Sequence, residues 1–176
     1  TAVDQAVDTF GGIDILVNNA GLIRRADAVD FTEADWDLVM NINLKTVFFM
    51  SQAVARLFIK QGDGGKIINI ASMLSYFGGG TVPGYSASKG GIAQLTKSLA
   101  IAYAPDGIRV NALAPGWIAT PLTEGLHNDP ARSQAILGRT PMARWGTPQD
   151  LIGPALFLAS KQAGFVTGSI LNVDGG

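Results

Sequence analysis

Four short apolar runs alternate along the chain with longer segments whose apolar residues recur at helical spacing. The runs occupy residues 13–17, 66–71, 108–114 and 169–173. The first of them is nearly continuously apolar, which is typical of a strand buried on both faces of a parallel sheet. Helical spacing is found in residues 1–10, 32–61, 85–103 and 147–160. The alternation predicts an α/β fold in which right-handed crossovers connect parallel strands.

One polar residue interrupts the apolar stripe of the predicted helix 32–61. The stripe consists of Trp36, Met40, Asn43, Val47, Met50, Val54 and Leu57. A buried amide without partners costs about 1–3 kcal/mol, so Asn43 is expected to have partners. A structural role at a helix kink is one interpretation, and a role in a site is the other. Thr32 and Asp35 form an aspartate variant of the capping box and predict where the helix starts.

Candidate chemistry lies between Ser72 and Lys89. Tyr85 and Lys89 stand four residues apart at the start of a predicted helix, so their side chains share one face. A cation about 4 Å from the phenol, at an effective dielectric constant of about 20, contributes about 4 kcal/mol, or roughly three pKa units. Lys89 is therefore expected to bring the pKa of Tyr85 near physiological pH, as general acid and base catalysis requires. Glycines at 78–80 let the chain fold back, so that the Ser72 hydroxyl can meet the phenol.

A Tyr-x-x-x-Lys spacing is weak evidence by itself, because both residues are common. Here it is accompanied by Asn18-Asn19-Ala20-Gly21, by Asn43, by Ser72 and by Pro115-Gly116, in a consistent order along the chain. With these motifs the sequence resembles the short-chain dehydrogenase/reductase family over essentially all 176 residues. The resemblance implies a Rossmann-like, doubly wound parallel sheet and a nicotinamide-dependent oxidoreductase.

The resemblance also implies roles for particular residues. Asn43, Ser72, Tyr85 and Lys89 would form a catalytic tetrad. In it Tyr85 exchanges the substrate proton, Ser72 orients the substrate oxygen, Lys89 lowers the tyrosine pKa and binds the nicotinamide ribose, and Asn43 completes a proton path. NAD is the expected cofactor, with NADP not excluded. The residues expected to bind it are Asn19, Ala20, Gly21, Tyr85, Lys89, Pro115, Gly116, Ile118 and Thr120.

The sequence contains no match to the strand and glycine-rich turn that hold the cofactor pyrophosphate in this family. Residues 1–176 are therefore interpreted as a single, incomplete domain without its N-terminal strands and glycine-rich cofactor loop, with a substrate lid at about 117–142. Two hypotheses follow. The full-length protein is an enzyme, or these residues alone are inactive and residues 13–17 form an unpaired apolar sheet edge that pairs with another chain.

Several stretches resemble the branch of the family that acts on deoxy-gluconates: residues 21–25, 31–36, 71–79 and 144–146. An acid sugar needs a cation, and Arg24 or Arg25 could pair with its carboxylate. A solvated arginine pair, or an ion pair with Asp27 or Asp30, explains these residues equally well. Because residues 84–91 and the lid are generic for the family, 3-oxoacyl-carrier-protein reductase and gluconate 5-dehydrogenase activities are alternatives.

Composition narrows the classes of partner. The chain is 47% hydrophobic and 15% charged, with a formal net charge of −1, and its basic residues are scattered. This profile is typical of a soluble domain and argues against nucleic acid. No cysteine is present, so neither a disulfide nor a metal site is expected, and His127 is interpreted as a solvated lid residue. No apolar run reaches the roughly 18 residues that a membrane span needs. A cytoplasmic protein is the simplest interpretation, and the resemblance implies a homotetramer at full length.

Overall fold

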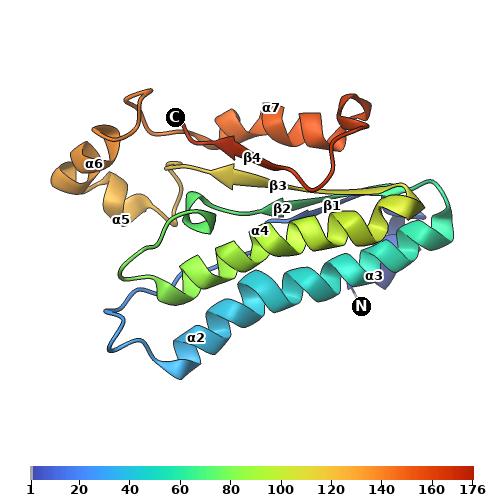
Figure 1. The fold of residues 1–176 in the computed structure, drawn as a ribbon, viewed down its shortest axis with the longest axis horizontal. Coiled ribbons are helices and arrows are strands. Elements are labelled where there is room, and N and C mark those ends of the chain that lie inside the picture. The colour runs from blue at the N-terminus through green and yellow to red at the C-terminus, as the bar shows by residue number, and fades with distance from the viewer. Residues whose placement is uncertain (1) are drawn as a thin grey trace.

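The computed structural model describes residues 2–176, which form one parallel sheet in the order β1-β2-β3-β4 (Figure 1). The strands are β1 Ile15–Asn18, β2 Gly65–Ile70, β3 Ile108–Pro115 and β4 Ile170–Val173. All three neighbouring pairs are parallel. The predicted α/β class and its four strands are confirmed, with boundaries shifted by about one or two residues, as is usual for strand ends.

Helices cover both faces of the sheet (Figure 1). The long helices α3 Thr46–Gln61 and α4 Pro83–Tyr103 lie on one face, and α7 Pro148–Ala159 lies on the other. The remaining helices are α1 Ala2–Phe10, α2 Glu33–Met40, α5 Glu124–His127 and α6 Pro130–Leu137. The Thr32 side chain caps α2 by accepting from the Asp35 N–H, and Thr147 with Asp150 forms a capping box at α7. The predicted starts of both helices are thus confirmed.

The predicted helix 32–61 is continuous, but it contains a π-helical segment, Asn41–Lys45, between α2 and α3. A π-helical turn holds an extra residue, and it therefore rotates the buried face relative to a regular helix. Trp36, before the π-helical segment, is 40% exposed, whereas Ser51, after it, is completely buried. The prediction that the stripe is buried is confirmed at Asn43, Val47 and Val54 and is wrong at Trp36. It also missed Ser51, a second buried polar residue of this helix.

By length and mean hydropathy alone, Glu33–Gln61 could cross a membrane, which the sequence expectation missed. In the structure this run packs along α4. Gly91 of α4 lies against Leu44, so closely that an added Cβ would come within 2.8 Å of the leucine side chain. One helix of this kind is weak evidence for a membrane span, because the core helix of a soluble protein and a signal sequence near the N-terminus pass the same test.

The main apolar core lies between the sheet and the α3–α4 layer. It comprises Val54, Ala55, Phe58, Ile67, Leu99, Ala100, Ile108 and Val110. Phe58 is completely buried against the first residue of β2, where a Cβ on Gly65 would lie 2.2 Å from a ring carbon. Glycine is therefore required at residue 65 by close approach rather than by its backbone angles. This packing fixes α3 against β2, the strand that leads to Ser72.

Asparagines connect the strands to the helices through the core. The Asn18 Nδ2 donates to Asn69 Oδ1 at 2.9 Å and to Ser51 Oγ at 3.0 Å. Asn69 in turn donates to Thr96 Oγ1 at 2.9 Å. Because Ser51, Asn69 and Thr96 are fully buried, each needs such a partner. The network joins β1, β2, α3 and α4, and Asn18 belongs to the Asn-Asn-Ala-Gly motif that the sequence singled out.

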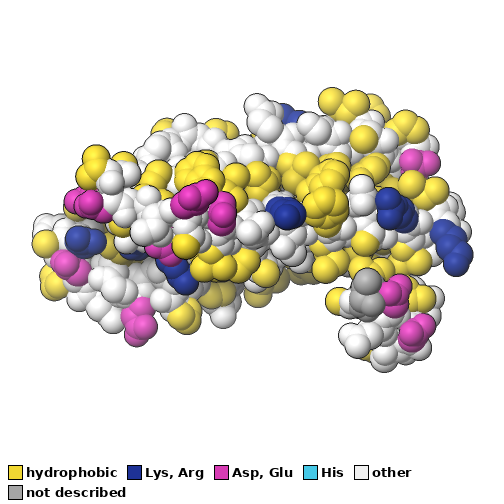
Figure 2. Space-filling model, turned by 90° about the horizontal axis from the view of Figure 1, so that it is seen from below, with side chains coloured by type: hydrophobic (Ala, Val, Ile, Leu, Met, Phe, Trp, Pro, Cys, Tyr) yellow, Lys and Arg dark blue, Asp and Glu magenta, His cyan; other side chains and the backbone are white. Residues whose placement is uncertain are grey.

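Strand β1 forms an edge of the sheet. Its side chains at Ile15 and Val17 are 41% and 50% exposed, so the prediction that this strand is buried on both faces is wrong. The reason is that Ile15 and Val17 point to the face opposite Leu16, which packs on the main core, and α7 covers that opposite face over β2, β3 and β4. Figure 2 shows α1 as a separate lobe at the lower right, and open apolar grooves run between this helix and the α3–β1 surface.

Candidate active site

Three side chains with candidate roles meet where β2 ends and α4 begins. Ser72 follows β2 closely, and Tyr85 and Lys89 lie early in α4. The Ser72 hydroxyl lies near enough to the Tyr85 phenol to lower its pKa, as the predicted folding back of the chain requires. The Lys89 Nζ lies 5.5 Å from the centroid of the Tyr85 ring. The structure therefore brings together the serine, tyrosine and lysine that the sequence singled out.

Tyr85 holds its proton more tightly than the sequence argument predicted. Burial raises the pKa of the phenol above its ordinary value of 10.0, and this outweighs the Ser72 hydroxyl and the Arg25 charge, both of which lower the pKa. The prediction that Lys89 brings this pKa near physiological pH is therefore wrong. It assumed a cation about 4 Å from the phenol, whereas the ammonium lies beside the ring and donates to a backbone carbonyl.

Lys89 is a buried ammonium that is attached to the end of β2. Its Nζ donates to the carbonyl oxygen of Ile70, the last residue of that strand, at 2.6 Å. Burial lowers the pKa of Lys89 from 10.5 to about 8. An ammonium carries three donors, so further donors are available to a ligand at this position.

Asn43 lies in the π-helical segment and holds the loop that follows β1. Its Oδ1 accepts from the Leu22 N–H at 2.9 Å, and its Nδ2 donates to the Leu22 carbonyl at 2.9 Å. The amide therefore has the partners that burial demands. Gly21 passes so near that an added Cβ would lie 3.3 Å from Asn43 Oδ1 and 3.8 Å from Lys89 Nζ. The predicted residues 19–21 thus approach the lysine through Gly21.

Two serines that the sequence analysis missed tie the site together. Ser88 is fully buried, accepts from Asn43 Nδ2 at 3.1 Å and donates to the Tyr85 carbonyl at 2.8 Å. Ser75 donates to the Lys89 carbonyl at 2.7 Å and accepts from the Ser72 N–H. Ser75 could have been found, because Ser-x-x-Ser after a strand is a capping pattern. Ser88 carried no signal beyond its place before the lysine.

The two candidate substrate arginines differ in their surroundings. The Nε of Arg24 forms an ion pair with Asp35 Oδ1 at 3.1 Å, and not with Asp27 or Asp30. Among residues 2–176 no ion pair involves Arg25, which is exposed. Its charge acts on the Tyr85 phenol and lowers that pKa. Arg25 is therefore the arginine whose charge reaches the candidate site.

The turn after β3 lies beside β4 and the start of the predicted lid. The Gly116 N–H donates to the Val173 carbonyl at 3.0 Å, and a Cβ on Gly116 would lie 2.6 Å from the Asp174 Cα. Thr123, which the sequence analysis did not single out, donates to the Ile118 carbonyl and accepts from the Thr120 N–H. Residues 115–120 are thus held at both ends. The segment that follows contains the short helices α5 and α6.

Residues 1–176 match a family model described as Enoyl-(Acyl carrier protein) reductase. The chain is 59% identical to the 2-dehydro-3-deoxy-D-gluconate 5-dehydrogenase of Dickeya dadantii over 99% of its own length and 69% of that protein.

The chain belongs to the short-chain dehydrogenase/reductase family.

Further members of the short-chain dehydrogenase/reductase family support this. The chain is 45% identical to the 5-keto-D-gluconate 5-reductase of Escherichia coli K12 over 99% of this chain and 68% of that protein. A gluconate 5-dehydrogenase from Burkholderia cenocepacia, solved with NADP and tartrate, superimposes with a TM-score of 0.96 at 46% identity, covering 99% of this chain and 68% of that one. The Rossmann-like prediction for the sheet is thereby confirmed.

The residues of this short-chain dehydrogenase/reductase fit a nicotinamide cofactor. Gly21 leaves space over Lys89 that any larger residue would fill, and the lysine has donors that could bind ribose hydroxyls. Thr123 fixes the Ile118 carbonyl and the Thr120 N–H beside the Pro115-Gly116 turn, where the carboxamide is expected, and the Thr120 hydroxyl lies 3.4 Å from the Thr123 hydroxyl. No group of His, Cys, Asp and Glu residues within 2–176 has the arrangement of a metal site.

Proposed function

We propose that the full-length protein is an NAD(P)-dependent oxidoreductase that acts on a hydroxyl or ketone of a sugar acid such as a deoxy-gluconate. One observation carries this proposal: Ser72, Tyr85 and Lys89 meet at one place, and the unpaired cation of Arg25 acts on the same phenol. The gluconate-type activities of its named relatives support the choice of substrate.

Each member of the tetrad contributes a separate step to the proposed mechanism. In the reducing direction the neutral phenol of Tyr85 donates its proton to the substrate oxygen, and in the oxidising direction the phenolate accepts one. Ser72 donates a hydrogen bond to the same oxygen and orients it. Lys89 stabilises the phenolate when it forms, and Asn43 keeps the loop at Leu22 in place for the proton path. A bound nicotinamide would supply or accept the hydride.

Arg25 is proposed to bind the substrate carboxylate. A guanidinium recognises a carboxylate with two parallel hydrogen bonds, and Arg25 has no ion-pair partner among the described residues that would compete. Arg24 is a weaker candidate because Asp35 already neutralises it.

The proposed cofactor is NAD, with NADP as the alternative. NADP is the nucleotide bound in the Burkholderia relative. The residues proposed to contact the nicotinamide half are those that the sequence named: Asn19, Ala20, Gly21, Tyr85, Lys89, Pro115, Gly116, Ile118 and Thr120.

The test of this function follows the absorbance of NADH and NADPH with the purified full-length protein. The substrates are 2-deoxy-D-gluconate, 2-dehydro-3-deoxy-D-gluconate, gluconate and an acetoacetyl thioester, each assayed in parallel. Turnover of a deoxy-gluconate supports the proposal. Turnover of the thioester alone, with NADPH, would instead support the alternative, a 3-oxoacyl-carrier-protein reductase.

We also propose that residues 1–176 are the catalytic and nicotinamide-binding part of one domain, with a lid at about 117–142, and that they are inactive alone. The exposed side chains of Ile15 and Val17 on edge strand β1 support this, because such an edge is suited to pairing with a further strand. Comparing NAD(H) binding by residues 1–176 with binding by the full-length protein tests it. Equal affinity would contradict it.

A cytoplasmic homotetramer is proposed as the functional form. Helix α7 presents Ile152, Leu156 and Phe157 to solvent, and Phe165 beyond it is fully exposed. Exposed apolar side chains that lie together are a usual sign of a protein interface.

A further inference from the structure

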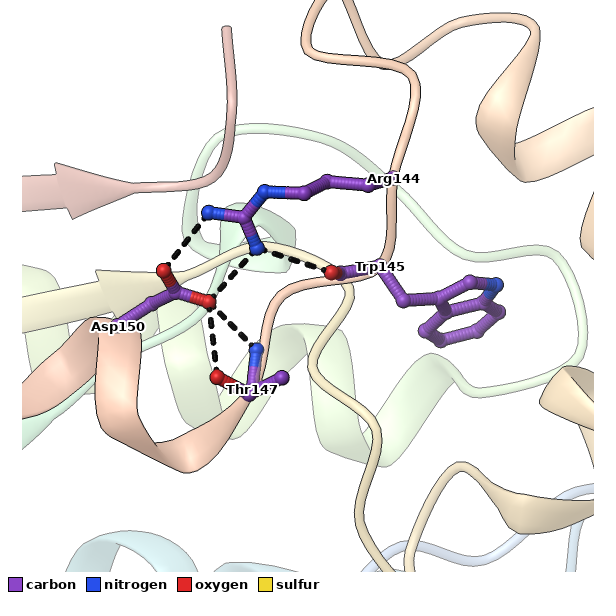
Figure 3. A network of polar contacts seen from close by, with 4 residues as sticks. All are labelled: Arg144, Trp145, Thr147 and Asp150. Atoms are coloured by element: carbon purple, nitrogen blue, oxygen red, sulfur yellow. Dashed lines mark hydrogen bonds and ion pairs between the residues drawn. The ribbon is translucent and has the colours of Figure 1, made fainter.

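Four hydrogen bonds to one carboxylate hold the segment that connects the lid to α7, residues 144–147. The guanidinium of Arg144 donates to both carboxylate oxygens of Asp150, at 2.8 and 2.7 Å (Figure 3). The same carboxylate accepts from the Thr147 N–H at 2.7 Å and from its hydroxyl at 3.1 Å. Asp150 belongs to the first turn of α7, so this network attaches the returning segment to that helix.

The same segment contacts the turn after β3. The Gly146 N–H donates to the Trp117 carbonyl at 2.9 Å, and the Ala119 N–H donates to the Gly146 carbonyl at 2.9 Å. Gly146 is pressed so closely against Ile118 that an added Cβ would lie 2.5 Å from its Cδ1. The position of Ile118 is therefore set by the backbone of residue 146, which Arg144 and Asp150 hold from the other side.

Trp145 connects this segment to the lid helices. Its indole points away from the Arg144–Asp150 pair (Figure 3). The ring lies edge-on to Trp117, with 5.9 Å between centroids, and to His127 of α5, with 5.1 Å between centroids. Its Nε1 donates to Ser133 of α6 at 2.8 Å. Residues 144–147 thus join α5, α6, α7 and the turn at Ile118.

Backbone strain lies directly before this junction. Among residues 2–176, Ala143 alone combines a side chain with a positive φ, of 50°. A non-glycine residue keeps such a conformation only where its surroundings impose it. The two-pronged bond from Arg144, the next residue, is a constraint of the required kind.

We propose that Arg144 and Asp150 are positioning residues, which hold Gly146 and through it the Ile118 turn in the geometry that receives the nicotinamide. The proposal rests on the proposed function only in naming the nicotinamide as the group at this turn. Neither residue touches the reacting atoms. Their effect is on cofactor affinity and on the packing of Trp117 with Trp145.

The test compares Arg144→Met and Arg144→Lys in the full-length protein, with Arg132→Met as the control. Arg132 lies in the same lid and pairs with Asp129 across 3.7 Å, and no ion pair within residues 2–176 joins it to the turn. Arg144→Met leaves the Thr147–Asp150 cap of α7 intact, so the helix start is preserved. The measurements are the Kd of NADH and NADPH by fluorescence titration, KM and kcat, near-ultraviolet circular dichroism of the tryptophans, and urea unfolding.

We expect Arg144→Met to raise the cofactor Kd and KM about tenfold, with kcat at saturating cofactor within about twofold of wild type. The near-ultraviolet dichroism of its tryptophans should weaken. Arg144→Lys should recover part of the cofactor affinity and part of the dichroism, because an ammonium can still form one hydrogen bond with Asp150. Arg132→Met should match wild type in both. Unchanged cofactor affinity in Arg144→Met overturns the proposal, as does a loss of affinity that a smaller folded fraction fully explains.

Failure of the proposed function would be seen separately. Wild-type protein that binds NAD(P)H but oxidises no sugar acid contradicts the substrate, whereas the cofactor Kd still decides the role of Arg144. If wild-type protein bound no nicotinamide nucleotide, both the proposed function and the role of Arg144 in receiving the nicotinamide would be overturned.

Discussion

Tyr85 is the residue on which the proposed chemistry depends most. Replacement by phenylalanine keeps the ring packed between α4 and the Ser72 loop but removes the proton that moves to or from the substrate. General acid and base catalysis contributes about 10²- to 10⁴-fold. We therefore expect Tyr85→Phe to lower kcat by a factor in this range, with an unchanged midpoint of urea unfolding. Retained turnover in this variant would contradict the assignment.

The pKa values of Tyr85 and Lys89 predict opposite pH dependence for the two directions of reaction. Burial raises the Tyr85 pKa, so the phenol is protonated at neutral pH and ready to donate in reduction. Burial lowers the Lys89 pKa to about 8, so the neighbouring pair begins to lose a proton near that pH. The oxidising reaction needs the Tyr85–Lys89 pair with one proton fewer, arranged as a phenolate beside an ammonium. Its kcat/KM should rise with pH through about 8 while that of reduction falls. A flat oxidation profile between about pH 7 and 9 would contradict this.

Arg25 and Arg24 offer a matched comparison for the substrate carboxylate. Removing a charged hydrogen-bond partner of a ligand costs about 1.5–3 kcal/mol, so Arg25→Ala should raise the KM for a sugar acid about 10- to 100-fold. Arg24→Ala should change KM little, because its guanidinium is taken by Asp35 at the surface. Initial rates at varied substrate measure both. Equal KM values in the two variants would reject the role of Arg25.

At the scale of elements, the site depends on how β2 and α4 are held against the rest of the core. Helix α3 fixes β2 by close packing of Phe58 on Gly65, and the π-helical segment between α2 and α3 places Asn43 beneath the loop at Leu22. π-helical turns of this kind are frequently found at functional sites. The position of Ser72 thus depends on packing at the opposite end of β2.

Gly65→Ala tests the packing of α3 on β2. Its Cβ would lie 2.2 Å from the Phe58 ring, and overpacking of a rigid core costs about 1–3 kcal/mol. We expect the free energy of unfolding to fall by that amount in a urea titration. Gly90→Ala is the control, because its Cβ meets nothing within 4 Å, and alanine in a helix interior is favoured by up to about 1 kcal/mol. If both variants had equal stability, close approach at residue 65 would not be the reason for glycine.

At the scale of the whole molecule, the exposed apolar side chains predict assembly. Leu156 on α7 is 63% exposed, and a charge there would be solvated in a monomer but buried in an interface. Leu156→Glu in the full-length protein should therefore lower the assembly state without unfolding the subunit, as sedimentation velocity measures. Gln149→Glu, at an exposed polar position of the same helix, should leave the mass unchanged. A wild-type monomer would contradict the proposal.

The sequence by itself determined the strands, the helices and the spacing of Ser72, Tyr85 and Lys89, because these depend on local periodicity and on motifs within short stretches of chain. It also indicated that Asn43 needs buried partners. Only the tertiary structure decided that burial raises the Tyr85 pKa, that Asp35 pairs with Arg24, that Arg25 acts on the phenol, and that β1 is exposed. These properties arise from desolvation and from charges brought together by distant segments, and no local pattern records how those segments pack.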